Sequence, residues 1–221
     1  MSDYLTDEEQ WQRIKTFWQY YGSWILIAVL TVTLVVFGWR WLEQRQLAQA
    51  TEGSIIYQQL LVSLAEQDTD AMMAQANQLI ETLPKSVYAH LGTLFLAREA
   101  VYDGEYETAL TYLKWVLQQT KQKPFAQIAR LRMARILIAQ ENYLEAQQIL
   151  ATVDDAKYLP LIEEIRGDIW VALGEIEQAR QAYDSALQQL PSAGTTRPVL
   201  AMKLYSLPAS SPIDVPMESQ S

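Results

Sequence analysis

The chain has 221 residues, enough for one sizeable hydrophobic core or for a smaller domain with a membrane anchor. It contains no cysteine, which excludes disulfides, thiolate metal ligands and thiol nucleophiles. Its formal net charge of −9 argues against a nucleic-acid binder, because phosphate neutralisation needs clustered Lys and Arg. Gly and Pro number only 8 each, and Ala, Leu, Gln and Glu dominate long stretches, so the composition favours an all-α fold.

The first predicted element is a membrane-spanning helix. The 24 residues between Lys15 and Arg40 carry no charge, and as a helix they would extend ~36 Å, against ~30 Å for the hydrocarbon core of a bilayer. Aromatic rings flank the apolar run, as in the interfacial belts of membrane proteins. We therefore predict a tail at 1–15, a transmembrane helix at 16–41, and contacts of the anchor with the lipid bilayer through Trp18, Tyr20, Tyr21, Trp24, Trp39, Arg40 and Trp41.

Two other interpretations of this segment are weaker. A buried core helix rarely needs so long an uncharged run. A cleaved signal peptide has a shorter apolar region and a small-x-small cleavage site, whereas this run ends in Phe37-Gly38-Trp39. Orientation is left open by charge, because Arg13 and Lys15 before the span balance Arg40 and Arg45 after it.

The region after the span contains an internal repeat. The stretch from Gly174 to Pro191 is typical of the second half of a tetratricopeptide repeat, in which small Ala179 lets two helices approach and Tyr183 fills the neighbouring groove. Similar stretches upstream place Ala109 and Ala146 at the position of Ala179. The resulting spacings of 37 and 33 residues lie close to the usual period of about 34.

Four helix pairs follow from this register. Apolar stripes over 90–101, 128–138 and 161–173 predict the first helices, with Gly167 at a position that requires a small residue. A weaker unit runs from 54 to 84, and its second helix contains Ala74 and Ala76. The sequence predicts an all-α fold, in which one N-terminal transmembrane helix precedes a degenerate tetratricopeptide-repeat solenoid of about four helix pairs over 42–194. A capping helix at 195–207 and a disordered tail with three prolines at 208–221 complete the prediction.

The residues that carry chemistry are few. His90 is the single histidine, and without a second His or any Cys we predict a capping or packing role for it. The carboxylate pairs Asp154-Asp155 and Glu163-Glu164 point to different faces of a helix, so we predict solvated charges. No Gly-rich phosphate loop or Gly-x-Ser-x-Gly motif occurs. We predict no catalytic, metal or cofactor site, and hence a protein that is not an enzyme.

A basic cluster is the candidate partner-binding site. Arg130, Arg132 and Arg135 form the densest group of cations, and Arg98 lies on the adjacent first helix. First helices line the concave surface of tetratricopeptide arrays, so these side chains could hold an acidic or carboxylate-ended peptide. The alternative is pairing inside the domain, with acidic side chains at Glu99, Glu141 or Glu145.

Aromatic residues gather in one repeat. Most of them are expected in the core by their spacing, and one or two are expected to remain exposed as a contact patch. The residues concerned are Tyr88, Phe95, Tyr102, Tyr106 and Tyr112.

The layout resembles the YfgM family, the ancillary subunits of the bacterial Sec translocon. Nearly the whole chain carries this resemblance, through the acidic tail, the single span ending in Gly38-Trp39-Arg40-Trp41, and a series of short stretches: Ile56-Tyr57-Gln58, Val87 to Gly92, Leu131 to Arg135, Arg166-Gly167-Asp168, Gly174 to Ala182 and Met202-Lys203-Leu204. It implies a protein of the Gram-negative inner membrane, with the amino end in the cytoplasm and the repeats in the periplasm. It also implies association with the SecYEG translocon, with a PpiD-type periplasmic chaperone and with unfolded secretory clients.

The predicted function is that of a membrane-tethered protein–protein interaction scaffold, ancillary to the Sec translocon, which links emerging secretory proteins to periplasmic chaperones. Two alternatives stay open. One is a structural adaptor in the assembly of an envelope complex, and the other is a regulator that acts through the cytoplasmic tail.

Overall fold

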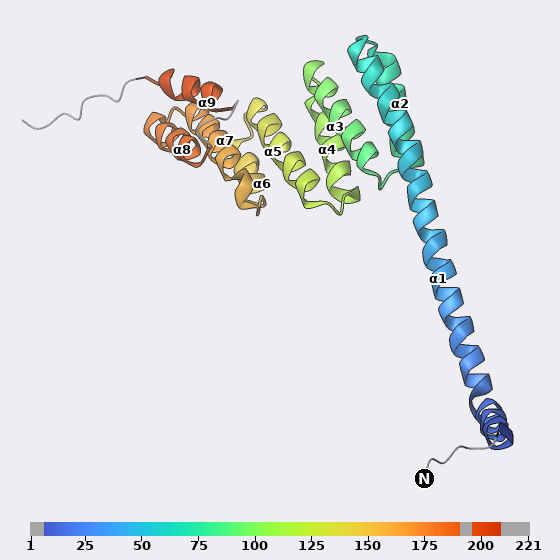
Figure 1. Cartoon of the computed structure of the whole chain (residues 1–221). Helices are drawn as coiled ribbons and strands as arrows, with labels where there is room; N and C mark the ends of the chain where they lie inside the picture. The colour runs from blue at the N-terminus through green and yellow to red at the C-terminus, as the bar shows by residue number, and fades with distance from the viewer. Residues whose placement is uncertain (1–6, 191–195, 209–221) are drawn as a thin grey trace, which may run out of the picture. The chain divides into compact units, whose positions relative to one another are not determined.

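The computed structural model describes residues 7–190 and 196–208 of the chain. Within these ranges all regular structure is helical, which confirms the predicted all-α fold. The elements are α1 (Asp7–Ala65), α2 (Thr69–Thr82), α3 (Val87–Tyr102), α4 (Tyr106–Gln119), α5 (Lys123–Ala139), α6 (Tyr143–Ala151), the short 3-10 helix η1 (Ala156–Tyr158), α7 (Leu159–Ala172), α8 (Ile176–Gln189) and α9 (Thr196–Tyr205) (Figure 1).

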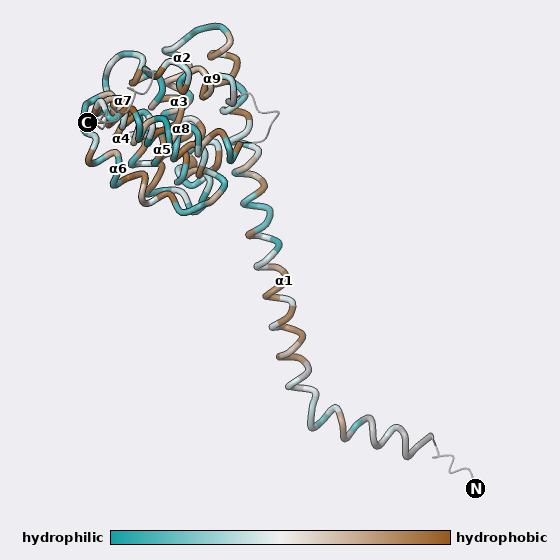
Figure 2. The backbone as a smooth tube through the Cα atoms, turned by 90° about the vertical axis from the view of Figure 1, so that its left-hand side faces the viewer, coloured by the Kyte–Doolittle hydropathy of each residue, from teal (hydrophilic) through white to brown (hydrophobic). Residues whose placement is uncertain are grey.

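The chain divides into two units, and the first ends at Ser54. This unit is the larger part of α1, which is brown, and therefore apolar, through its middle in Figure 2. In the described part of the chain, α1 alone is long and apolar enough to cross a membrane, and none of its most apolar stretch is buried against protein. Thr31 and Thr33 donate their hydroxyl hydrogens to the carbonyls of Ile27 and Val29, both at 2.8 Å, so their polarity is satisfied inside the helix.

The helix does not stop at residue 41, where the sequence predicts the end of the membrane span. Instead, α1 continues without a break to Ala65 and supplies the first helix of the first repeat. The reason lies in residues 42–52, which contain neither Gly nor Pro and are rich in Leu, Glu, Gln and Ala. The division between the two units falls instead between Ser54 and Ile55, beside Gly53.

The second unit is a row of helix pairs. The pairs are α3 with α4, α5 with α6, and α7 with α8, and α9 packs against α8 (Figure 1). The end of α1 forms the first pair with α2, because Ile56 and Leu60 share a buried cluster with Met72. The turn inside each pair contains one residue with a positive φ: Gln67 (+59°), Gly104 (+77°), Glu141 (+60°) and Gly174 (+79°). Only two of these are glycine, the residue that adopts this conformation without a steric penalty. Counted from the turn residue, the four pairs share one register.

This register places a small side chain opposite a large one in every pair. Two buried positions, one seven residues before the turn residue and the other nine residues after it, carry side chains of complementary size. The first pair has the large side chain before the turn and the small one after it, and the other three have the reverse order. The couples are Leu60 and Ala76, Ala97 and Leu113, Ala134 and Leu150, and Gly167 and Tyr183.

The predicted packing alanines are confirmed. Ala109, Ala146 and Ala179 lie five residues after their turn residues and are fully buried. In the first pair the same position is occupied by buried Met72, while Ala76 is buried and Ala74 is exposed. The first repeat is therefore the most divergent of the four.

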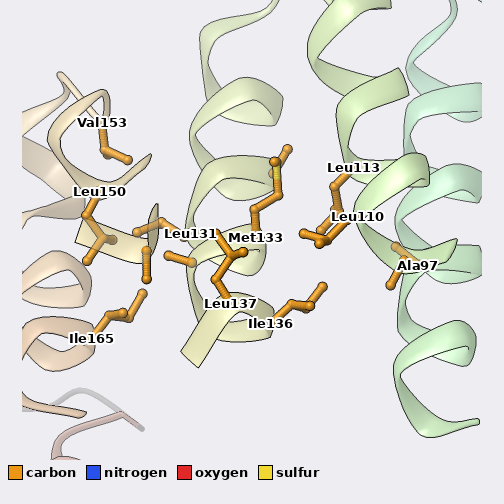
Figure 3. Close-up of a cluster of buried hydrophobic side chains, with 14 of the residues drawn as sticks. Ala97, Leu110, Leu113, Leu131, Met133, Ile136, Leu137, Leu150, Val153 and Ile165 are labelled. Carbon is orange, nitrogen blue, oxygen red and sulfur yellow. The ribbon is translucent and has the colours of Figure 1, made fainter. Parts of the chain in front are cut away.

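The core runs through the stacked pairs. Figure 3 shows its central part, where side chains of α3 to α7 meet without interruption around Leu113, Met133, Leu137 and Ile165. A second cluster fills the start of the row between α1, α2 and α3. At the other end Leu200 of α9 is buried against α8 and covers the last pair, and burying such a side chain contributes about 2 kcal/mol. The predicted stop at Pro191 lies outside the described residues, as do residues 209–221 of the disordered tail predicted for 208–221.

Candidate partner-binding groove

His90 is buried in the core of the second unit and is 1% exposed. Its ring centroid lies 5.4 Å from that of Phe125 and 6.1 Å from that of Trp115. Neither ring nitrogen has a hydrogen-bond partner among the described residues, and burial lowers the pKa of the imidazole. The predicted packing role is confirmed, whereas the helix is capped by Ser86, whose hydroxyl accepts from the Ala89 amide at 3.0 Å.

Three of the four predicted arginines line a single groove. Arg98 on α3 and Arg132 and Arg135 on α5 surround a space of about 440 Å³, which we call the arginine groove. Its remaining lining residues are Ala97, Val101, Tyr102 and Leu113. Arg98 and Arg135 each lie six residues before the turn residue of their pair, so the repeat places them at equivalent positions on neighbouring first helices.

The three guanidinium groups differ in how they are held. Arg98 binds Glu99, with its Nη2 2.6 Å from the Oε1 atom, and lies over the rings of Phe95 and Tyr102. Arg132 donates from Nη1 to the backbone carbonyl of Leu94 at 3.0 Å. Desolvation lowers the pKa of Arg132, and the like charges of Arg98 and Arg135 lower it further. A guanidinium nevertheless stays charged at neutral pH.

Arg130 does not belong to the groove. Two residues apart on a helix are separated by about 200°, so Arg130 leaves α5 on the side away from Arg132. There its Nη1 donates to Gln127 Oε1 at 3.2 Å, and Gln127 in turn donates to Asp154. The proximity of the three α5 arginines in the sequence predicts a single cluster. The helical period instead places Arg130 on a different face of α5 from Arg132.

The alternative, that these arginines pair with acidic side chains of the same domain, holds in part. Arg98 has Glu99 as its partner, whereas Glu145 accepts from Asn142. Arg135 approaches a carboxylate that the sequence did not suggest, Glu164 on α7, at 3.6 Å. A partner 29 positions along the chain leaves no signal in local spacing.

The prediction of solvated charges is wrong for Glu164. This carboxylate is 7% exposed and accepts from Lys203 Nζ at 2.8 Å. Lys203 also binds Asp168 at 2.8 Å, and the Tyr183 hydroxyl donates to Asp168 at 2.7 Å. Burial raises the pKa of that phenol, as does its hydrogen bond to the carboxylate. The network ties α9 to α7 and α8, since Lys203 comes from the last helix.

Tyr102 is the aromatic side chain of its repeat that remains exposed. It is 76% exposed, while Tyr88, Phe95, Tyr106 and Tyr112 are half-buried or packed against the core. Together with Arg98 it also lines a second groove of about 340 Å³, which extends over the turn between α1 and α2. The two grooves share both side chains and are therefore neighbours along the surface of α3.

The aromatic residues predicted for the membrane anchor lie along α1 on both sides of its apolar stretch. Trp18, Tyr20, Tyr21 and Trp24 are exposed before it, and Trp39 and Trp41 are exposed after it. The guanidinium of Arg45 lies over the ring of Trp41, 5.5 Å from its centroid. Their contacts with lipid stay a prediction.

Known proteins are similar to this chain in sequence. A family described as the tetratricopeptide repeat-like domain matches residues 15–209. Proteins named "Ancillary SecYEG translocon subunit" are similar over most of their length. The one from Neisseria gonorrhoeae is 26% identical over 94% of this chain and 100% of its own, and the one from Escherichia coli is 24% identical over 85% and 90%.

The relative from Aggregatibacter actinomycetemcomitans is 26% identical over 82% of this chain and 89% of its own. The resemblance predicted from the sequence is thereby confirmed. The match spans the apolar helix and all four helix pairs, and this chain belongs to the tetratricopeptide repeat-like domain family.

Proposed function

We propose that this protein is a membrane-tethered interaction scaffold that acts beside the Sec translocon. The observation that carries the proposal is the extent of the likeness to ancillary SecYEG translocon subunits, which covers 94% of this chain and 100% of the relative from Neisseria gonorrhoeae. The matched length includes both the apolar helix and the repeats of this chain, which supports one shared role for the two parts. The residues provide no nucleophile paired with a base, which fits a binding protein better than an enzyme.

Each unit has its own task in this proposal. The apolar part of α1 lies in the inner membrane with the amino end in the cytoplasm, and the repeats lie in the periplasm. Tethering raises the effective concentration of the repeats near a membrane partner without any new contact. The stacked pairs offer an extended surface on which a PpiD-type chaperone and an emerging secretory chain are held close together.

Two variants test the tether. The first lacks residues 1–42, and the second replaces 16–41 with an unrelated single-span helix. We expect the first to leave the membrane fraction and to lose most of its co-purification with SecYEG, and the second to keep both properties. If the released repeats co-purify with the channel as well as the full chain does, tethering is not the mechanism. If the replaced span abolishes association, the helix itself makes the specific contact.

Photo-crosslinking in vivo tests the partners. Photoreactive residues at exposed positions along 88–135 should capture a periplasmic chaperone and secretory clients, and positions within the span should capture the channel. Capture of proteins of a cell-wall or outer-membrane assembly would instead support the structural adaptor. A cytosol-dependent reporter fused after residue 221 should stay dark, and a bright reporter would contradict the periplasmic placement of the repeats.

A further inference from the structure

We propose that the arginine groove binds an extended protein segment through an acidic side chain inside the segment, with an apolar neighbour of that acid resting on Val101 and Tyr102. This inference rests on the proposed function, since it names the chemistry of the partner that the scaffold holds.

Charge is the first support. Residues 43–221 contain 14 Lys and Arg against 22 Asp and Glu, a net of −8. The arginine groove is an exception on this acidic domain, because three of its seven lining residues are arginines and none is a carboxylate. Crowding like charges is unfavourable unless an anion offsets it, and the charges of Arg98 and Arg135 add to the desolvation that lowers the pKa of Arg132.

The unused hydrogen-bond donors of Arg132 and Arg135 are the second support. Within the described residues, Arg132 donates to one acceptor, the Leu94 carbonyl, so most of its five N–H groups remain available. Arg135 is 3.6 Å from Glu164, beyond a normal hydrogen bond, and Glu164 is already bound by Lys203 at 2.8 Å. A carboxylate entering between Arg132 and Arg135 would gain charge-assisted bonds from both.

The apolar part of the lining defines the rest of the ligand. Half-buried Val101 and exposed Tyr102 give the groove an apolar surface beside its cations, and Ala97 and Leu113 are buried beneath it. Tyr102 presents a large, exposed ring at this place, the kind of side chain that contributes most at binding surfaces. An acidic residue next to Leu, Val or Ile matches both halves of the groove.

The adjacency of the two grooves on α3 favours a passing segment over a chain end. The arginine groove and the second groove over the α1–α2 turn share Arg98 and Tyr102. A carboxyl terminus would need one groove alone, whereas an extended segment can occupy both. The second groove adds the oxygens of Asp68, Thr69 and Glu99, which can accept hydrogen bonds from the backbone N–H groups of the continuing segment.

The experiment measures peptide binding by the full chain in lipid nanodiscs without translocon. The probe is a fluorescein-labelled nine-residue peptide of alternating Glu and Leu with both ends blocked. One comparison peptide has Gln in place of every Glu, and another is the Gln peptide with a free carboxyl end. We expect the Glu peptide to bind at least about 10-fold more tightly than the blocked Gln peptide, since charge-assisted hydrogen bonds differ from neutral ones by about this factor.

Variants locate the binding site. Arg132→Gln should weaken binding of the Glu peptide about 10-fold or more, whereas Arg130→Gln, on the other side of α5, should change it less than about twofold. Arg132→Gln also removes the bond to Leu94, so unfolding of each variant is compared with that of the parent. Tyr102→Ala alters an exposed side chain and should leave stability intact while weakening binding about threefold or more.

Several results would overturn the inference. They are equal binding of the Glu and Gln peptides, equal losses in Arg130→Gln and Arg132→Gln, or tight binding by the free-ended peptide alone. A chain ending at Pro208 provides one more test, because the removed residues include Ile213-Asp214-Val215. If that truncation raises affinity about 10-fold, the chain's own tail is the occupant. Peptide binding can fail while crosslinks to SecYEG persist, and then only this inference falls.

Discussion

Replacing Gly167 with alanine tests whether the small–large couples hold the repeats together. A Cβ at this position would lie 2.2 Å from Cε1 and 2.4 Å from Cδ1 of Tyr183. Ordinary contact begins near 3.4 Å, so helix and ring would have to separate by about 1 Å. The ring has little room to move, because it is 3% exposed and its hydroxyl is bonded to Asp168.

The expected cost follows from two opposing terms. Overpacking a filled core costs about 3 kcal/mol when backbone or an aromatic ring must shift. Alanine in place of glycine inside a helix returns about 1 kcal/mol. The net destabilisation of Gly167→Ala is therefore about 2 kcal/mol, which corresponds to a urea midpoint lower by roughly 1 M.

A double variant separates overpacking from other effects. Gly167→Ala with Tyr183→Leu recreates the couple of an alanine and a leucine present as Ala97 and Leu113 in an earlier pair. We expect it to be more stable than the sum of the two single changes by at least about 1 kcal/mol. Tyr183→Phe keeps the ring, so it should give no such rescue.

The assay is urea unfolding of the full chain in non-ionic detergent, followed by far-ultraviolet circular dichroism and tryptophan fluorescence. A neutral or stabilising effect of Gly167→Ala would refute the reasoning. So would strict additivity in the double variant, because the ring and the new methyl group would then not meet.

Three further predictions concern the turns, His90 and the last helix. Glu141→Gly should stabilise the domain by about 1 kcal/mol because φ at this residue is +60°. Gly174→Ala, at φ +79°, should destabilise the domain by about as much. The urea midpoint of unfolding measures both effects. His90 has a lowered pKa when folded, so below pH ~6.5 the unfolded chain binds a proton that the folded chain does not, and stability should fall by up to ~1.4 kcal/mol per pH unit. Lys203→Met leaves Glu164 with Arg135 at 3.6 Å and should speed hydrogen exchange of the amides of α9.

Each of these has its own control. The acid slope should be smaller in His90→Phe, and an unchanged slope would assign it to other groups. Arg166→Met removes an exposed cation that pairs with Glu163 on α7, and it should leave exchange in α9 unaltered. An equal effect of Arg166→Met and Lys203→Met would mean that the network of Glu164 and Asp168 does not hold α9.

Much of this architecture could be predicted because it depends on neighbours in the chain. The uncharged run before Arg40, the period of the repeats and the alanines at 109, 146 and 179 are local patterns, and the three alanines are buried as their spacing predicts. The aromatic excess of one repeat also predicted that a ring stays exposed, and Tyr102 is exposed, while its role as a contact residue stays a prediction. A pattern of this kind reports which face of a helix is apolar.

Other features arise from contacts between distant residues. Glu164 is buried because Lys203, on the last helix, and Arg135, on a preceding pair, converge on it. The arginine groove joins Arg98 to Arg132 and excludes Arg130, which is nearer in the sequence.

The amino-acid sequence alone therefore determined where the helices form, how they pair and where the apolar span lies, because these depend on local conformational preference and periodicity. The stacking of the pairs decided which charges are buried and which arginines share a groove. Stacking sets the rotation of each helix against the next, and no spacing along one helix specifies that rotation.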